Sequence, residues 1–383
     1  MSDNLSSSEL VRLIKTVFPP QENDRNLAIL VDLPDLDRPD NPKWERRREL
    51  AYQWSRMLRE AKDLLGLDSV SVICYQNVSL NNANLPEICW KVDDPPTEWD
   101  QDFLRGSRQA IKLEESLSGQ NIILAPTEFS TTAPLKLLAR KYGFRAATMP
   151  GFSEAMVPAL RLDWSEVARR VHMMKERLDH SDKATIEFLV DSSESYTLEL
   201  DLRFRSATAS NGLFPKPGMA GNLPSGETYI VPYEGELEER SLSAGLMPVQ
   251  IDQEVVLYEI EANRAVKVLS EGQHSKFEAN KLLNEPAYGN IAELGIGVLS
   301  PLGIKPIGEI LLDEKLGLHI AFGRSDHFGG ATGPGQFKNA ANVEHIDRIY
   351  IQETQPRVTV KACTLIEQRG ETLLMENGEF MIF

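Results

Sequence analysis

The sequence predicts a two-domain protein, in which an open parallel α/β sheet with helices on both faces is followed by a β-rich α+β domain. Two patterns support this fold class. Up to about residue 160, apolar runs of strand length alternate with helical patterns, as in proteins with a covered parallel sheet. After Asp182, short alternating segments are separated by Asn, Gly, Pro and Asp, which is typical of antiparallel strands. A length of 383 residues also exceeds what one core usually holds.

The N-terminal half opens on a helix whose start carries a capping-box pattern, Ser6 followed by Glu9. Its apolar residues then predict a regular alternation of helices and strands. The expected helices run from Ser6 to about Val17 and over Pro42–Leu65, Trp99–Leu117 and Thr132–Tyr142, and the expected strands are Asn26–Val31, Ser69–Cys74, Asn121–Leu124 and Phe144–Thr148. Neither GxGxxG nor GxxxxGK[ST] occurs here, so no phosphate-binding loop is indicated.

Two helical segments, Glu154–Leu160 and Trp164–Leu178, connect this half to the β-rich half. The strands expected in the second half are Thr185–Val190, Tyr196–Leu202, Thr228–Pro232, Gly245–Ile251, Glu254–Ile260, Arg264–Leu269, Gly317–Phe322 and Glu344–Gln352. We therefore predict an α/β domain over residues 1–160, a helical connection over residues 161–182 and a β-rich domain over residues 183–383.

The composition narrows the classes of partner. A formal net charge of −16 argues against binding to nucleic acid or to an anionic membrane, because both need a basic surface. The three cysteines, Cys74, Cys89 and Cys363, are far apart in apolar contexts, which indicates buried thiols rather than disulfides or a thiolate zinc site. We find no signal-peptide pattern and no apolar run of about 20 residues. These observations predict a soluble cytoplasmic protein.

The stretch from Gly317 to Asp347 concentrates side chains that bind metals. It holds His319, His327 and His345, three of the six histidines in the chain, and ends on Asp347. Because side chains alternate across a strand, His345 and Asp347 share one face of the last predicted strand, and His319 projects from the strand before it. Two extended segments are therefore predicted to aim imidazoles and a carboxylate at a common point.

Two glutamates upstream extend this set. Glu227 follows a Pro-Ser-Gly turn at a strand entrance, and Glu293 lies among small residues that leave room beside its carboxylate. With His319, His345 and Asp347 they make five potential ligands without a thiolate. Such a set suits a pair of divalent ions, Zn²⁺, Co²⁺ or Mn²⁺, with one carboxylate between them.

The stretches PSGETYIVP, NIAELGIGV, GLHIAFG and HID, in this order, resemble the metal-binding segments of the aminopeptidase T family of metallopeptidases. The resemblance extends upstream through RAATMPGFSEAM and so covers most of the chain. It implies that the five metal ligands are Glu227, Glu293, His319, His345 and Asp347, with Glu293 as the bridge. It also implies a homodimer in which each chain has an α/β domain and a β-rich metal-binding domain.

The chain departs from the peptidase pattern in two places. Where those peptidases have a tyrosine after the first histidine, this chain has Asp326-His327, and the interval from His319 to His345 is shorter. The same superfamily includes proteins similar to 2,5-dihydroxypyridine dioxygenases, which use one Fe²⁺ to cleave an aromatic ring. A different reaction on the same fold is therefore an open alternative.

These observations together predict a metal-dependent hydrolase, an aminopeptidase acting on short peptides or on a related small amide. We assign His327 to proton transfer or oxyanion contact and Arg324 to recognition of a substrate carboxylate; the ordinary alternatives are a loop histidine and a surface ion pair. The enzyme alternative is a mononuclear Fe(II) dioxygenase, in which His319 or His327 joins His345 and Asp347. A third possibility is a non-catalytic metal-binding scaffold.

Overall fold

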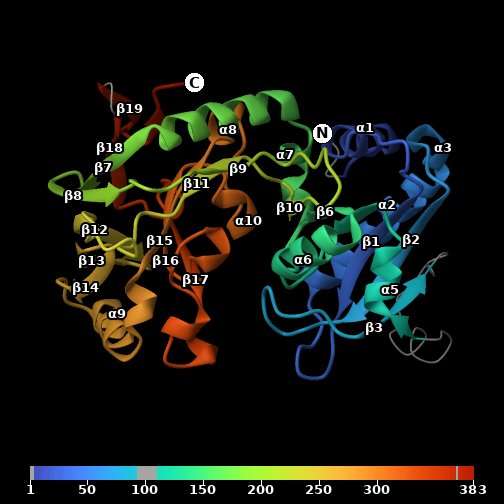
Figure 1. The fold of residues 1–383 in the computed structure, drawn as a ribbon, viewed down its shortest axis with the longest axis horizontal. Coiled ribbons are helices and arrows are strands. Elements are labelled where there is room, and N and C mark those ends of the chain that lie inside the picture. The colour runs from blue at the N-terminus through green and yellow to red at the C-terminus, as the bar shows by residue number, and fades with distance from the viewer. Residues whose placement is uncertain (1–3, 93–109, 368–369) are drawn as a thin grey trace. The chain divides into compact units, whose positions relative to one another are not determined.

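The computed structural model describes residues 4–92, 110–367 and 370–383. Within these residues the strands form three sheets, and the chain divides into two compact units (Figure 1). Unit 1 holds the described residues up to Trp164 together with Gly212–Ser225, and unit 2 holds Ser165–Asn211 and the described residues from Gly226 onward. No helix in the described part of the chain is long and apolar enough to cross a membrane.

Unit 1 is built around one sheet with the strand order β10-β6-β5-β1-β2-β3-β4. Its strands are β1 (Asn26–Leu33), β2 (Ser69–Gln76), β3 (Ile88–Val92), β4 (Ile111–Lys112), β5 (Ile122–Ala125), β6 (Arg145–Thr148) and β10 (Ala220–Asn222). Neighbours from β10 to β2 run parallel, whereas β3 and β4 extend one edge in antiparallel orientation. The predicted α/β fold class is confirmed, and the antiparallel edge is a feature that the sequence did not indicate.

Helices cover both faces of this sheet. In chain order they are α1 (Ser7–Val17), α2 (Pro42–Glu60), α3 (Lys62–Leu65), α5 (Leu113–Ser118), α6 (Thr132–Tyr142), the 3-10 turn η1 (Glu154–Met156) and α7 (Val157–Leu160). On one face, Leu117 of α5 and Leu135 of α6 pack in a core with Leu30 of β1. Leu27 and Ile29, which point to the opposite face, are equally buried where α2 contacts β1 and β2.

Local sequence explains where these helices begin and end. The predicted capping box is present, since the Ser6 side chain accepts from the Glu9 backbone and the Glu9 side chain accepts from the Ser6 backbone. The single helix predicted over Pro42–Leu65 is interrupted at Ala61, so that α2 ends there and α3 follows. The helix predicted over Trp99–Leu117 lies largely outside the described residues, and α5 overlaps its end.

A buried carboxylate joins two of the parallel strands at their carboxyl ends. Asp32 of β1 is 1% exposed and accepts hydrogen bonds from the backbone N–H groups of Glu128 (2.8 Å) and Phe129 (3.0 Å), which follow β5. Its Oδ1 also accepts from the indole Nε1 of Trp44 in α2, at 3.0 Å. Asp32 therefore links β1, the loop after β5 and α2, and removing its charge or its acceptors leaves buried donors unpaired.

We expect Asp32→Asn to lower the free energy of unfolding of unit 1 by about 2–3 kcal/mol, because an amide NH₂ would face backbone N–H donors that a carboxylate now satisfies. Urea unfolding followed by tryptophan fluorescence, to which the buried Trp44 contributes, measures the change. The matched control is Asp68→Asn, whose side chain is 76% exposed and whose nearest ion-pair partner, Arg25, is 3.9 Å away. Equal effects of about 0.5 kcal/mol or less in both variants would contradict the linking role of Asp32.

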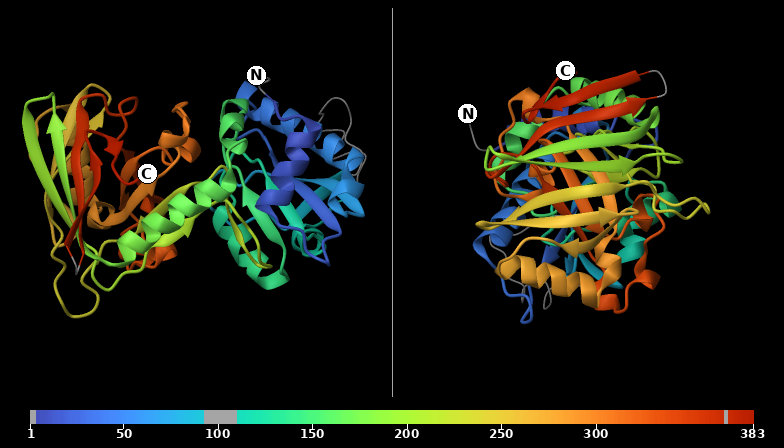
Figure 2. Two further views of the ribbon diagram at one scale, coloured as in Figure 1. Left: turned by 90° about the horizontal axis from the view of Figure 1, so that it is seen from above. Right: turned by 90° about the vertical axis from the view of Figure 1, so that its left-hand side faces the viewer.

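Unit 2 contains two antiparallel sheets in the described residues. The five-stranded sheet has the order β17-β16-β15-β11-β9, and the eight-stranded sheet has the order β14-β13-β12-β8-β7-β18-β19-β20, seen face-on in the right-hand view of Figure 2. The strands are β7 (Ser181–Val190), β8 (Glu194–Asp201), β9 (Thr208–Ser210), β11 (Glu227–Ile230), β12 (Ala244–Ile251), β13 (Glu254–Glu261), β14 (Arg264–Val268), β15 (Ile291–Gly297), β16 (Leu318–Gly323), β17 (His345–Ile349), β18 (Val358–Glu367), β19 (Gly370–Glu376) and β20 (Glu379–Phe380). The helices are α8 (Trp164–Asp179), α9 (Gln273–Asn284) and α10 (Ile310–Asp313), with 3-10 turns η2 (Pro286–Gly289), η3 (Ser300–Leu302), η4 (Asp326–Phe328), η5 (Pro334–Gln336) and η6 (Ala340–Asn342).

One apolar core joins these two sheets and α8. The five-stranded sheet contributes Ile296 and Ile320, the eight-stranded sheet contributes Phe188 and Val249, and α8 contributes Met174. Because side chains alternate across a strand, burying this face of the five-stranded sheet directs every second residue of its strands to the other face. That other face carries the candidate site.

The chain crosses between the units more than once. After β9 of unit 2 it returns to unit 1, where Ala220–Asn222 pair with β6 as the parallel strand β10. The predicted domain boundaries place these residues in the second domain, because a three-residue strand has no recognisable pattern. The helix predicted as part of the connection, α8, packs Met174 and Leu178 into the core of unit 2. The division into independently folding domains stays a prediction.

Candidate metal centre

All five predicted ligands lie on the five-stranded sheet of unit 2. Glu227 is the first residue of β11, and Glu293 lies within β15. His319 is the second residue of β16, and His345 and Asp347 both belong to β17. The predicted strand that placed His345 and Asp347 on a common face is therefore observed as β17.

The register of the sheet puts the five side chains on one face. Ala321 of β16 pairs with Glu293 on one side and with Asp347 on the other, and Gly295 of β15 pairs with His319. Directly paired residues in neighbouring strands point the same way. Positions between the ligands on this face are occupied by small residues, and a Cβ at Gly295 would collide with the imidazole of His319. Glycine at this position thus gives the imidazole its room.

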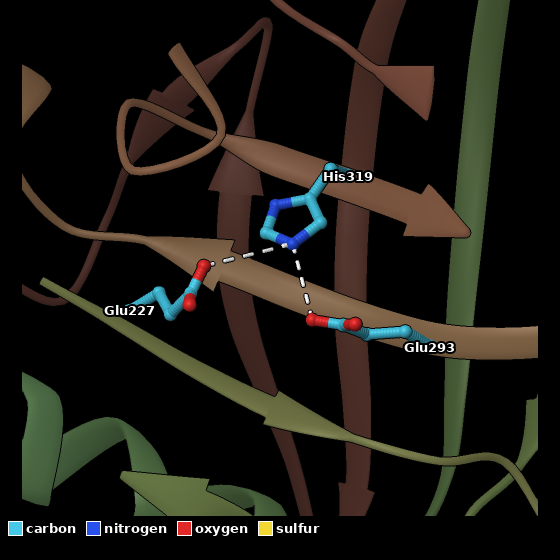
Figure 3. A group of neighbouring side chains, drawn as sticks. All are labelled: Glu227, Glu293 and His319. Atoms are coloured by element: carbon cyan, nitrogen blue, oxygen red, sulfur yellow. Dashed lines mark hydrogen bonds and ion pairs between the residues drawn. The ribbon is translucent and has the colours of Figure 1, made fainter. Parts of the chain in front are cut away.

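The first group of donors consists of Glu227, Glu293 and His319, and its geometry is drawn in Figure 3. The Nε2 atom of His319 lies 3.3 Å from Glu293 Oε1 and 3.8 Å from Glu227 Oε2. All three side chains are buried. Glu227 Oε2 and His319 Nδ1 have no hydrogen-bond partner among the described residues. Buried polar atoms without a partner cost free energy, and a cation bound among these donors would give Glu227 Oε2 a partner.

The second group consists of Glu293, His345 and Asp347. The Nε2 atom of His345 lies 3.1 Å from Glu293 Oε2 and 3.4 Å from Asp347 Oδ1. Its Nδ1 lies 2.8 Å from the backbone oxygen of Arg324, which can only accept, so Nδ1 carries the proton. In the neutral imidazole, this tautomer leaves the lone pair of Nε2 directed at the carboxylates, as in histidines that bind metals.

The spacing of the donor atoms fits divalent ions. Four donors at about 2.1 Å from a tetrahedral ion lie about 3.4 Å from one another. The distances within the two groups, between 3.1 and 3.8 Å, lie around this value. In each group the donor atoms all lie within 4.8 Å of one another. Carboxylates and imidazoles without thiolates are also the donors that Zn²⁺, Co²⁺, Mn²⁺ and Fe²⁺ accept.

The electrostatics of the site point the same way. Burial lowers the pKa of His319, but the hydrogen bond to Glu293 and the charges of Glu293, Asp347 and Glu227 outweigh it and raise the pKa to about 9. His345 is likewise raised well above its usual pKa, because Asp347 and Glu293 outweigh its burial. The carboxylates thus draw positive charge onto both imidazoles. A divalent cation bound here would supply that charge in place of the protons.

A buried lysine at the edge of the first group was not found by the sequence analysis. Lys315 is fully buried, and its Nζ lies 2.6 Å from Glu227 Oε1 and contacts the carboxylate of Glu314. Burial raises the pKa of Glu314 to about 8. The positive charge of Lys315 lowers this pKa, and the negative charges of Glu227 and Asp347 raise it. An Asp-Glu-Lys run usually marks a solvated turn, so the sequence contains no signal for this burial.

A tyrosine on the same face was also missed. Tyr229 lies two residues after Glu227 in β11 and pairs with Gly295, the neighbour of His319. Burial raises the pKa of its phenol, and the charges of Glu293 and Glu227 raise it further, so the hydroxyl keeps its proton. Strand alternation from Glu227 would have placed Tyr229 at the site.

His327 lies beside the second group, in the 3-10 turn η4 that follows β16. Its ring centroid is 5.3 Å from that of His345, with the two planes at 82°. Burial lowers the pKa of the imidazole, and the charges of His345 and Arg324 lower it further, to about 4. His327 is therefore neutral near pH 7 and able to accept a proton.

The loop that carries His327 is held by a buried carboxylate. Glu234 accepts hydrogen bonds from the Ser325 hydroxyl (2.7 Å) and from the Asn290 side chain (2.5 Å), and also from the backbone N–H of Ala331. Ser325 and Ala331 lie on either side of His327. The turn is thus attached at both ends, which fixes the imidazole beside His345.

Arg324 takes part in the site through its backbone, whose oxygen orients His345. Its guanidinium Nε donates to Asp326 Oδ1 at 2.5 Å, and both side chains are about one-third exposed. The predicted recognition of a substrate carboxylate would therefore compete with this ion pair, and that role stays a prediction.

No protein-family model matches the chain, and no curated protein matches its sequence. Solved structures share its fold. A 2,5-dihydroxypyridine dioxygenase from Pseudomonas putida KT2440 matches with a TM-score of 0.60 at 14% identity, over 99% of this chain and 99% of the other. Wild-type AmpT from Thermus thermophilus matches with a TM-score of 0.54 at 14% identity, over 98% of each chain.

These matches show a shared fold along the whole chain. At 14% identity they do not show membership of either family. They confirm the predicted fold class, an α/β domain with a β-rich domain. One neighbour is a peptidase and the other a dioxygenase, so both kinds of enzyme are found on this fold.

Proposed function

We propose that this protein is a metal-dependent hydrolase with a two-metal centre, an aminopeptidase that removes N-terminal residues from short peptides or cleaves a related small amide. One observation supports this most directly. Glu293 directs Oε1 toward His319 and Oε2 toward His345, at 3.3 and 3.1 Å. A carboxylate with one oxygen in each of two donor groups has the geometry of a bridging ligand. Each remaining donor belongs to one group only.

The chemistry follows from the donors and their neighbours. Divalent ions in the two groups would act as Lewis acids on a water molecule and on the scissile carbonyl. The phenol of Tyr229 retains its proton and can donate a hydrogen bond on the same face of the sheet. The neutral imidazole of His327 can accept a proton from the attacking water and pass it to the leaving amine. A homodimeric assembly belongs to this proposal as the resemblance implies it, and a cytoplasmic location stays a prediction from the sequence.

The second candidate is a mononuclear Fe(II) dioxygenase. His319, His345 and Asp347 make up the two-histidine, one-carboxylate set of non-haem iron oxygenases. The dioxygenase from Pseudomonas putida also shares the fold. Against this candidate, a single ion held by those three residues would leave Glu227 Oε2 buried without a partner. The hydrolase proposal gives that oxygen a ligand role.

An assay with both substrate classes separates the two candidates. Metal-depleted protein is reconstituted with Co²⁺, Zn²⁺ or Mn²⁺ and given leucine p-nitroanilide and unblocked di- and tripeptides, with the N-acetylated peptides as the matched control. In parallel, protein loaded anaerobically with Fe²⁺ is given 2,5-dihydroxypyridine, and oxygen uptake is measured. We expect release of N-terminal residues from the unblocked peptides only. Oxygen uptake without peptide cleavage would overturn the hydrolase proposal.

A further inference from the structure

Lys315 brings a fixed positive charge to one side of the centre. Its side chain is fully buried and bonds to Glu227, the carboxylate that belongs to the first group alone, and to the carboxylate of Glu314. The backbone of Lys315 is fixed as well. Its carbonyl oxygen accepts a hydrogen bond from the Leu299 N–H at 2.9 Å, and it packs so closely on Gly297 that a Cβ there would collide with the Lys315 carbonyl. The ammonium therefore has little freedom to move away when a cation binds.

The second group has no such cation in the part of the chain that the structure describes. Asp347 forms no ion pair there with a lysine or an arginine; its recorded partner is His345. The adjacent Arg348 points to the opposite face, where it donates to the Tyr288 hydroxyl at 3.0 Å. Negative charge on Asp347 is thus fully available to a metal ion, whereas that on Glu227 is shared with Lys315.

The histidine of the second group is also held in place by a hydrogen bond that the histidine of the first group lacks among the described residues. His345 is oriented by its Nδ1 hydrogen bond to the Arg324 carbonyl. His319 Nδ1 has no hydrogen-bond partner among the described residues. Partners that orient a metal-binding histidine typically change metal affinity by about 10–100-fold. Charge and orientation, two independent features, therefore both favour the second group.

We propose that Lys315 makes the metal centre asymmetric. The Glu293–His345–Asp347 position binds its ion tightly, and the Glu227–Glu293–His319 position binds a second ion weakly and exchangeably. This inference rests on the proposed two-metal centre. A unit charge a few ångströms from a divalent ion is expected to weaken its binding by about tenfold or more even at an effective dielectric constant of 20.

The test titrates the full-length, metal-depleted protein with Co²⁺ and follows binding by calorimetry and by the visible absorption of bound Co²⁺. We expect two binding steps whose dissociation constants differ by at least about tenfold. Glu227→Gln should remove the weak step and keep the tight one. Asp347→Asn should remove the tight step. Two steps of equal affinity, or removal of the tight step by Glu227→Gln, would overturn the inference.

Variants of Lys315 separate the effect of its charge from that of its hydrogen bonds. Lys315→Gln removes the charge and keeps a donor for Glu227, and Lys315→Met removes both. If the charge weakens the first position, Lys315→Gln tightens the weak step by about tenfold or more and leaves the tight step unchanged. The matched control is Lys183→Met, which removes a lysine from the ion pair with Glu199, at 2.6 Å on the eight-stranded sheet. It should change neither step.

Each outcome has a distinct meaning. Weaker binding at the first position in Lys315→Gln would contradict the charge effect and overturn the proposal. If that variant fails to fold, Lys315→Met tests whether removing the charge tightens the weak step, and Glu227→Gln with Asp347→Asn still decides which position is weak. Binding of one ion or none, in the wild-type protein and in Lys315→Gln alike, would overturn the two-metal function itself. Two equivalent ions would leave that function standing and remove only the asymmetry.

Discussion

Glu293→Gln is expected to bind neither metal ion tightly and to lose hydrolase activity. Glu293 is the one donor common to both groups, with Oε1 toward His319 and Oε2 toward His345. An amide has one weakly basic oxygen and a donor NH₂, so it cannot serve both positions. Even partners that only orient a ligand change metal affinity by about 10–100-fold, and losing a shared ligand should exceed about 100-fold at each position.

Metal content measured by plasma mass spectrometry after gel filtration checks this result. Wild-type protein should approach two ions per chain at saturating Co²⁺ and keep at least the tightly bound ion after gel filtration, whereas Glu293→Gln should retain none. The control is Glu187→Gln, a partly exposed glutamate of β7 that pairs with Lys361 at 3.0 Å. It should bind metal as the wild type does. One tightly held ion in Glu293→Gln would show that this carboxylate is not the bridge.

His327→Ala is expected to keep both metal ions and to lower kcat by about 10²–10⁴-fold, the usual range for a general acid or base. The imidazole lies against His345 without being a member of either donor group, and Glu234 fixes its loop. A group that acts mainly in the transition state affects turnover more than substrate binding, so KM should change little.

Steady-state kinetics and metal analysis on the same preparation check this prediction. His180→Ala is the control, because His180 is exposed after α8 and its Nδ1 hydrogen-bonds to the Glu176 backbone oxygen, away from the five predicted ligands. Loss of one metal ion in His327→Ala would make His327 a ligand and favour the mononuclear iron enzyme. An unchanged kcat on a verified peptide substrate would reduce His327 to an ordinary loop residue.

Most elements of the fold could be read from the sequence because their signals are local. The capping box at Ser6 and Glu9 and the apolar run of β1 depend only on neighbouring residues. The sequence predictions did not include β3, β4, β9, β10, β15, β18, β19 or β20. Of these, β10 is a short edge strand, which owes its conformation to the strand beside it. β10 pairs with β6, about 75 residues earlier in the chain, through three residues only.

For the candidate site, the residue types and the side chains that share a face can be read from the sequence alone. His345 and Asp347 are two apart in a strand, and this period places both side chains on one side wherever the strand lies. Tyr229 follows Glu227 by the same rule. These conclusions hold before any strand is paired, because they depend on backbone geometry alone.

The division of the donors into two groups that share Glu293 is seen only in the folded structure. That division depends on the register of β11, β15, β16 and β17, which is set by an apolar core on the opposite face. The position of Lys315 is likewise seen only in the folded structure. Its ammonium donates to Glu227, although the two residues are 88 positions apart in the chain. Burial of a charge is a property of the folded surroundings and leaves no periodic trace in the sequence, so the asymmetry proposed for the centre could be seen only in three dimensions.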